Sequence, residues 1–99
     1  MWTGTLALDL LLGDVRSLKQ KRSVVRPIVA EMQRRHAVAA AEAGHLDLHR
    51  RTLIGVAVVA ADRGHCVDVL DACERSLEGH PEVDVLSARA RFISSDDDD

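Results

Sequence analysis

Basic side chains dominate one segment of this sequence, and their types and spacing suggest phosphate chemistry. Between positions 16 and 35 there are seven lysine and arginine residues, and Glu31 is the only acid. Ordinary exposed helices pair acids with bases four residues apart, and this segment largely lacks such pairs. Since arginine offers a fork of donors to phosphate oxygens, the segment predicts a nucleic-acid-binding surface. Five of the bases gather on a helical wheel opposite the apolar residues: Arg16, Lys19, Arg22, Arg26 and Arg34.

Two further arginines extend this predicted surface. Arg89 and Arg91 alternate with small residues near the end of the chain and are expected to point outward from a strand. A second interpretation of all these bases stays open. They could be a solvated surface that is neutralised by acids elsewhere in the fold or in a partner subunit.

A histidine-containing loop holds the second group of residues whose side chains could do chemistry. His45, Asp47 and His49, with Glu42 nearby, carry imidazole and carboxylate groups that suit zinc and similar metals. The spacing H-x-D-x-H matches no recognised metal motif, so no metal site is predicted. We expect local roles instead, with Asp47 capping loop amides and His45 bonding a carbonyl at a strand end.

Motifs of catalysis are missing from the sequence. It contains no G-x-S-x-G, P-loop, G-x-G-x-x-G or H-E-x-x-H pattern. Cys66 and Cys73 fall on the apolar stripe of an acidic helix, where a thiol is expected to be buried, reduced and unreactive. We therefore predict no enzyme activity, no catalytic residue, no cofactor and no small-molecule substrate.

The elements that must position these residues follow from hydrophobic periodicity. Period-two alternation predicts strands, and a period of about 3.6 predicts helices. Ser17 with Gln20 forms a capping box at the start of the first helix, and Pro27 predicts a kink or local break near Ser23–Arg26. Asp62 caps the second helix, and Gly79 suits the C′ position at its end. The expected elements are strand 2–12, helix 17–36, strand 37–43, loop 44–50, strand 52–61, helix 63–78 and strand 82–93.

This β-α-β-β-α-β order predicts an α+β ferredoxin-like sandwich, with a four-stranded antiparallel sheet and two helices on one face. In the last strand, Leu86, Ala88, Ala90 and Phe92 are expected to face inward. Residues 1–93 form the single expected domain, and 94–99 an acidic, disordered tail. The net charge of −3 divides into +4 over residues 1–51 and −7 over residues 52–99. No apolar stretch could cross a bilayer and no secretory signal is evident, so we expect a cytoplasmic protein without membrane contact.

Four motifs in this chain occur together: SLKQKRSVV (17–25), AE-x-x-H-x-DL (41–48), IGVAVV (54–59) and HPEV (80–83). They resemble the YlxP-like family of short bacterial proteins of unassigned function. They occur in the family's order and cover roughly residues 1–93, although His49 stands where the family often has tryptophan. The resemblance implies a ferredoxin-like fold and, because the family is typically encoded near translation-initiation and ribosome-maturation genes, a role around RNA or the ribosome.

Two functions follow as expectations. The first is a non-enzymatic RNA- or ribosome-associated accessory protein that contacts phosphates of ribosomal RNA or a ribosomal particle through the basic helix. With 2% aromatic residues, stacking on bases is not expected. The alternative is a homodimeric protein-interaction module that docks an acidic protein partner. A homodimer is expected because residues 52–61 are apolar at both parities, and two helices can cover only one sheet face.

Overall fold

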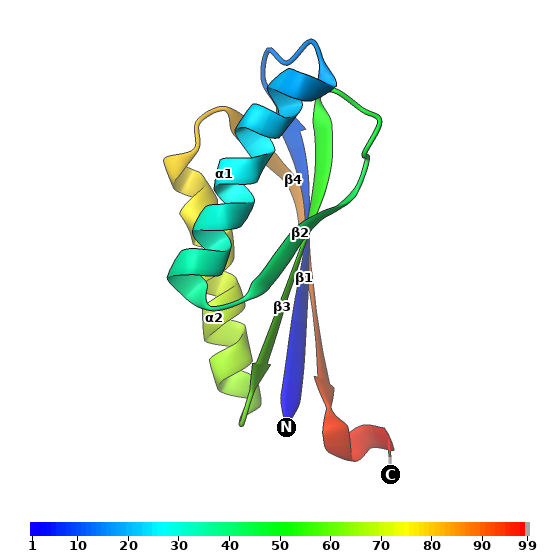
Figure 1. Cartoon of the computed structure of the whole chain (residues 1–99). Coiled ribbons are helices and arrows are strands. Elements are labelled where there is room, and N and C mark those ends of the chain that lie inside the picture. Colours follow the sequence, from blue (N-terminus) through cyan, green and yellow to red (C-terminus); the bar gives the residue numbers. More distant parts are fainter. Residues whose placement is uncertain (99) are drawn as a thin grey trace.

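The computed structural model describes residues 1–98, which contain four strands and two α-helices (Figure 1). The strands form one antiparallel sheet in the order β2-β3-β1-β4, so the predicted ferredoxin-like arrangement is confirmed. Both helices lie on the same side of this sheet. The elements are β1 (Trp2–Leu12), α1 (Leu18–His36), β2 (Ala39–Gly44), β3 (Arg51–Ala60), α2 (Arg63–Ser76) and β4 (Val83–Ser94).

The hydrophobic core lies between the sheet and the two helices. Alternate residues of β1 and β3 point into it, which is the period-two pattern of a sheet covered on one face. Gly4 lies where α2 approaches closely, because a Cβ there would stand 3.0 Å from Leu70 Cδ1. The main buried side chains are Leu6, Leu8, Leu10, Leu12, Val25, Ile28, Met32, Ile54, Val56, Val58, Cys66, Leu70 and Cys73.

Both predicted helix caps form, with one change of partner. Ser17 Oγ accepts a hydrogen bond from the Gln20 amide at 3.1 Å, and Gln20 Oε1 accepts from the Arg16 amide at 2.7 Å rather than from the Ser17 amide. Asp62 Oδ1 accepts from the His65 amide at 2.8 Å. Of the kink or local break predicted near Ser23–Arg26, the break is wrong. Helix α1 continues through the exposed Pro27, because the core contacts of its inner face hold it in place.

Several expected boundaries and orientations also differ. Strand β2 begins at Ala39, because Ala37 ends α1 in the left-handed region at φ 53° and ψ 46°. Gly79 lies in a short 3₁₀ turn and has no positive φ, so the C′ assignment is wrong. A bulge in β4 opposite Asp9 and Leu10 pairs Leu10 with Val85. The bulge leaves Leu86 49% exposed rather than facing inward.

The last strand is joined to the beginning of the chain. Ser94 is buried as the last residue of β4, and the Ser95 amide donates to the Met1 carbonyl at 2.9 Å. Ser95–Asp98 form a second 3₁₀ turn, while Asp99 of the predicted acidic tail lies outside the described residues. Cys66 and Cys73 are buried and free, as expected, and burial raises the pKa of the Cys73 thiol. Within residues 1–98, neither helix has the length and apolar character needed to cross a membrane.

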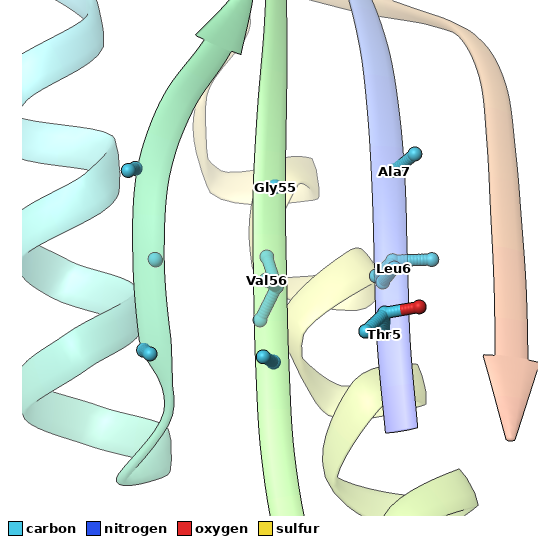
Figure 2. A pocket seen from close by; sticks show the side chains of 9 residues that line it. Thr5, Leu6, Ala7, Gly55 and Val56 are labelled. Carbon is cyan, nitrogen blue, oxygen red and sulfur yellow. The ribbon is translucent and has the colours of Figure 1, made fainter. Parts of the chain in front are cut away.

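The opposite face of the sheet carries no helix. Its centre is an open hollow with a volume of about 410 Å³, floored by small side chains from three strands (Figure 2). At one end of the sheet, Val59 is 62% exposed and Ile93 is 51% exposed, and each pairs with Thr3. The small residues on this face are Thr5, Ala7, Ala39, Ala41, Gly55 and Ala57.

Candidate nucleic-acid interface

The outer face of α1 brings three of the predicted basic residues together. Lys19, Arg22 and Arg26 are exposed and line a shallow hollow with a volume of about 360 Å³. Among the hydrogen bonds and ion pairs of residues 1–98, none involves these three side chains. We call them the α1 basic triad. Their positive charge is therefore directed into solvent along one helix face.

The other two predicted residues of α1 lie at its ends. Arg16 Nε is 3.2 Å from Asp14 Oδ1, and both side chains are more than 80% exposed, so this pair is worth little. Arg34 is exposed eight residues beyond Arg26, which is about 12 Å along the helix axis. Arg34 can therefore extend the basic surface but does not contact the triad.

Arg89 and Arg91 lie on a different surface from the helix residues. In the β1–β4 register Arg89 pairs with Ala7 and Arg91 with Thr5, so both side chains are on the open face of the sheet. The helices cover the other face, and β4 is the edge strand farthest from β2. The structure therefore separates these two arginines from the triad.

The single acidic residue of α1 faces away from the triad. Glu31 Oε2 lies 3.0 Å from His80 Nε2, and Glu31 Oε1 accepts from Arg35 at 3.1 Å. The hydrogen bond with His80 and that with Arg35 hold the pKa of the Glu31 carboxyl below its usual value. His80 belongs to the HPEV motif, so this motif ties α1 to the segment before β4. Glu31 is thereby committed and does not neutralise the triad.

A groove runs between α1 and the edge strand β2. One part has a volume of about 280 Å³ and includes Arg22, Arg26 and Gln33, and the other has about 270 Å³ and includes Lys21 and Asp47. Gln33 Nε2 donates to the Ala40 carbonyl at 2.9 Å and so joins the helix to the strand. Two residues, Arg22 and Glu42, line both parts and mark their junction.

A buried ion pair, not predicted from the sequence, forms the floor of this groove. Lys21 is only 2% exposed, and its Nζ lies 2.8 Å from Glu42 Oε2 and 2.6 Å from the His45 carbonyl. The hydroxyl of Thr52, which is fully buried, donates to Glu42 Oε2 at 2.7 Å. The sequence does carry one indication that Lys21 is buried, because it lies four residues before Val25 on the apolar stripe.

The loop after β2 is held from a second side by charges on the sheet. Arg51 donates to both carboxylate oxygens of Asp9 at 2.8–2.9 Å, and His45 Nε2 lies 3.5 Å from Asp9 Oδ1. The Arg51 hydrogen bonds, with a smaller contribution from His45, hold the pKa of Asp9 below its usual value. His45 thus faces a carboxylate rather than the expected strand-end carbonyl. In the described part of the chain, His45, Asp47 and His49 do not converge as metal ligands.

Comparison with known proteins gives a family but no activity. The family described as "Protein of unknown function (DUF503)" matches residues 3–90. The uncharacterized protein YlxP of Bacillus subtilis (strain 168) is 28% identical over 90 residues, which cover 91% of this chain and 98% of that protein. Neither description assigns a reaction or a partner.

Two solved structures resemble the fold at 9% sequence identity. The de novo designed protein Foldit4 has a TM-score of 0.55, with coverage of 96% of this chain and 99% of that one. SnoaB, a cofactor-independent oxygenase from Streptomyces nogalater, has a TM-score of 0.49, with coverage of 94% and 92%. The Foldit4 likeness concerns the fold alone, and the SnoaB likeness is weaker still.

Replacing Lys21 with methionine tests the buried ion pair. Methionine fills similar space but removes the ammonium, so Glu42 keeps only the Thr52 hydroxyl and the His45 carbonyl only the Leu48 amide. We expect the free energy of unfolding to fall by about 3 kcal/mol, as for other broken buried pairs. Arg26→Met on the exposed side of α1 is the matched control, with an expected change within about 0.5 kcal/mol. Equal urea midpoints for the two variants would contradict the structural importance of the pair.

Asp9→Asn tests the charges that hold the loop. Because folding lowers the pKa of Asp9, its ionised form stabilises the fold above the ordinary value of 3.8. This stabilisation is lost as the pH falls below that value and the carboxyl is protonated. Urea unfolding should therefore show wild type more stable than Asp9→Asn at neutral pH, with the difference shrinking below pH 3.8. A difference that is constant across this range would show that the Asp9 charge does not contribute.

Proposed function

Because the chain belongs to the DUF503 family, whose description assigns no function, we propose a function from its own residues. We propose that it is a non-enzymatic cytoplasmic accessory protein that binds RNA, on the ribosome or a ribosomal particle, through phosphate contacts of α1. The observation that carries this proposal is the contrast between the bases of α1. Lys21 and Arg35 have acidic partners within the fold, whereas the α1 basic triad has none among the described residues.

Phosphate is the group that fits this triad best. Three like charges on adjacent helix turns repel one another, and an anionic ligand removes that cost. Binding by phosphate contact also suits the scarcity of aromatic side chains. The ring of Phe92 is covered by the Arg63 guanidinium at 4.7 Å from the ring centroid, and Trp2 is half-buried. Recognition then depends on backbone charge and shape rather than on stacking.

Arg34 and the pair Arg89 and Arg91 take secondary parts in this proposal. Arg34 lies on the same helix and can contact a phosphate farther along the same strand. Arg89 and Arg91 lie across the sheet, so they could engage only a second RNA segment or one that passes around the sheet edge. The main affinity is therefore assigned to the triad.

Charge reversal on the triad tests the proposal. Arg22→Glu with Arg26→Glu alters exposed side chains, so the fold should persist while RNA affinity falls at least about a hundredfold. For wild type, four phosphate contacts at about 0.7 counterions each give a log–log salt slope of about −3. Filter binding at several salt concentrations with labelled ribosomal RNA measures both quantities.

The matched control is Arg89→Glu with Arg91→Glu, which makes the same change in net charge on the opposite sheet face. This variant should keep most of the affinity. If the two double variants bind alike, net charge rather than the triad determines the affinity. If wild type binds no RNA or ribosomal particle, the proposed function is wrong.

A second candidate function is a homodimeric module that docks an acidic protein partner on the triad. The open sheet face favours this candidate, because its floor of small apolar residues and exposed Val59 and Ile93 would be covered by a second copy. Association with a partner from lysate that resists ribonuclease would support this candidate. Association that ribonuclease abolishes would support RNA binding.

Light scattering tests the dimer directly. We expect a mass twice that of the chain at micromolar concentration. Ala57→Glu places a charge in the hollow of the open face and should shift the protein to a monomer. Ala30→Glu, the same substitution on the exposed surface of α1, should leave the dimer intact. A wild-type monomer at this concentration would reject the homodimer.

A further inference from the structure

The carboxylate of Glu42 is only half used by the fold. Its Oε2 accepts from both Lys21 Nζ and the Thr52 hydroxyl, while Oε1 accepts from no donor within residues 1–98. The Glu42 side chain keeps 23% of its surface exposed and lines both parts of the α1–β2 groove. A rigidly held acceptor is thus directed into the groove that adjoins the α1 basic triad.

We propose that Glu42 selects a base of single-stranded RNA lying along this groove, favouring bases with an exocyclic amino group over uracil. The proposal rests on RNA binding by the triad and adds a specificity-determining residue to it. Arg22, which lines both the groove and the hollow of the triad, joins the phosphate surface to this position.

Charge decides which part of the RNA meets Glu42. A carboxylate repels a phosphate, so the RNA backbone follows Lys19, Arg22 and Arg26 on the outer side of α1. The base attached to that backbone can then turn toward β2, where Glu42 lies. The groove volume beside Glu42, about 280 Å³ on the side of Arg26, is near the lower limit of about 300 Å³ for small-molecule sites.

Hydrogen-bond chemistry decides which base is favoured. An ionised carboxylate only accepts hydrogen bonds, and here only Oε1 is unoccupied by the fold. Cytosine offers its N4 amino group as a donor, a pairing that carboxylates make with this base. Uracil presents the O4 carbonyl at the same position, so two acceptors would face each other. Because cytosine and uracil have nearly the same shape, the amino or carbonyl group at position 4 is what distinguishes them in this groove.

Lys21 and Thr52 hold the Glu42 carboxylate in place, and this allows it to discriminate between cytosine and uracil. A mobile glutamate could turn away from uracil, but two donors at 2.8 and 2.7 Å hold this carboxylate at its Oε2. A simpler role would be that Glu42 only balances the buried charge of Lys21. In that case cytosine and uracil would be bound equally, so the two roles predict different measurements.

The experiment compares labelled twelve-nucleotide oligocytidylate and oligouridylate by fluorescence anisotropy. For wild type we expect about tenfold tighter binding of oligocytidylate, at the lower end of the discrimination given by good base contacts. Glu42→Gln introduces an amide that both donates and accepts, so the ratio should fall to about twofold or less. Equal affinities of wild type for oligocytidylate and oligouridylate would overturn the proposal. This comparison needs no variant, so it remains valid if Glu42→Gln fails to fold.

Asp47→Asn is the matched control, because it removes the same charge from the same groove. It should raise the affinity for both oligonucleotides and leave their ratio unchanged. If Asp47→Asn changes the ratio as much as Glu42→Gln, the preference comes from general charge and the proposal is wrong. The triad is judged separately by the salt slope and by Arg22→Glu with Arg26→Glu. If wild type binds the two oligonucleotides equally but keeps its salt slope, only the role of Glu42 is rejected, whereas absence of all RNA binding rejects both.

Discussion

The ion pair between Lys21 and Glu42 is the constraint on which the arrangement of α1, β2 and the basic triad depends. A lysine on the core-facing stripe of α1 must be partnered, since an uncompensated charge at 2% exposure is costly. Glu42 supplies the partner from β2, and the His45 carbonyl accepts a second bond, so the edge strand and its loop are both tied to the helix. The geometry of the helix then sets the direction of the neighbouring bases. With Lys21 directed inward, Lys19 and Arg26 project toward the opposite, solvent side, and Arg22 lies between them and the groove.

The sheet imposes a second constraint, of a simple geometric kind. Strand β3 is apolar on both faces, and the two helices cover the side that carries Ile54, Val56 and Val58. The centre of the other side is lined by small residues, and this side remains open. The basic triad, which we propose binds phosphates, and the open apolar surface therefore lie on opposite sides of one thin sandwich. An RNA on α1 and a second copy on the sheet could be bound together without competing.

Most of the architecture could be predicted from the sequence because it rests on periodicity and local caps. Strands β1 and β3, both helices, the Ser17 and Asp62 caps and the burial of both cysteines are local in origin. The bulge that exposes Leu86 arises from pairing with β1, which no local pattern encodes. The polar cluster was missed for a related reason. The helical wheel leaves Lys21 out of the five bases opposite the apolar residues, and its position between Leu18 and Val25 puts it on the buried stripe, but periodicity alone does not identify a partner for it. Its partner Glu42 could be identified only once β2 lay beside α1.

The placement of the acids explains why the exposed bases stay unneutralised. Residues 1–51 have a net charge of +4, yet both acids nearest the triad in α1 and β2 are committed, Glu31 to His80 and Arg35, and Glu42 to Lys21 and Thr52. Among the ion pairs of the described residues, no acid from the second half of the chain pairs with a base of α1. The fold thus pairs its buried charges and leaves the triad, with Arg34 farther along α1, in contact with solvent and counterions only. That residual repulsion is free energy that folding does not recover, and an anion bound along α1 would recover it.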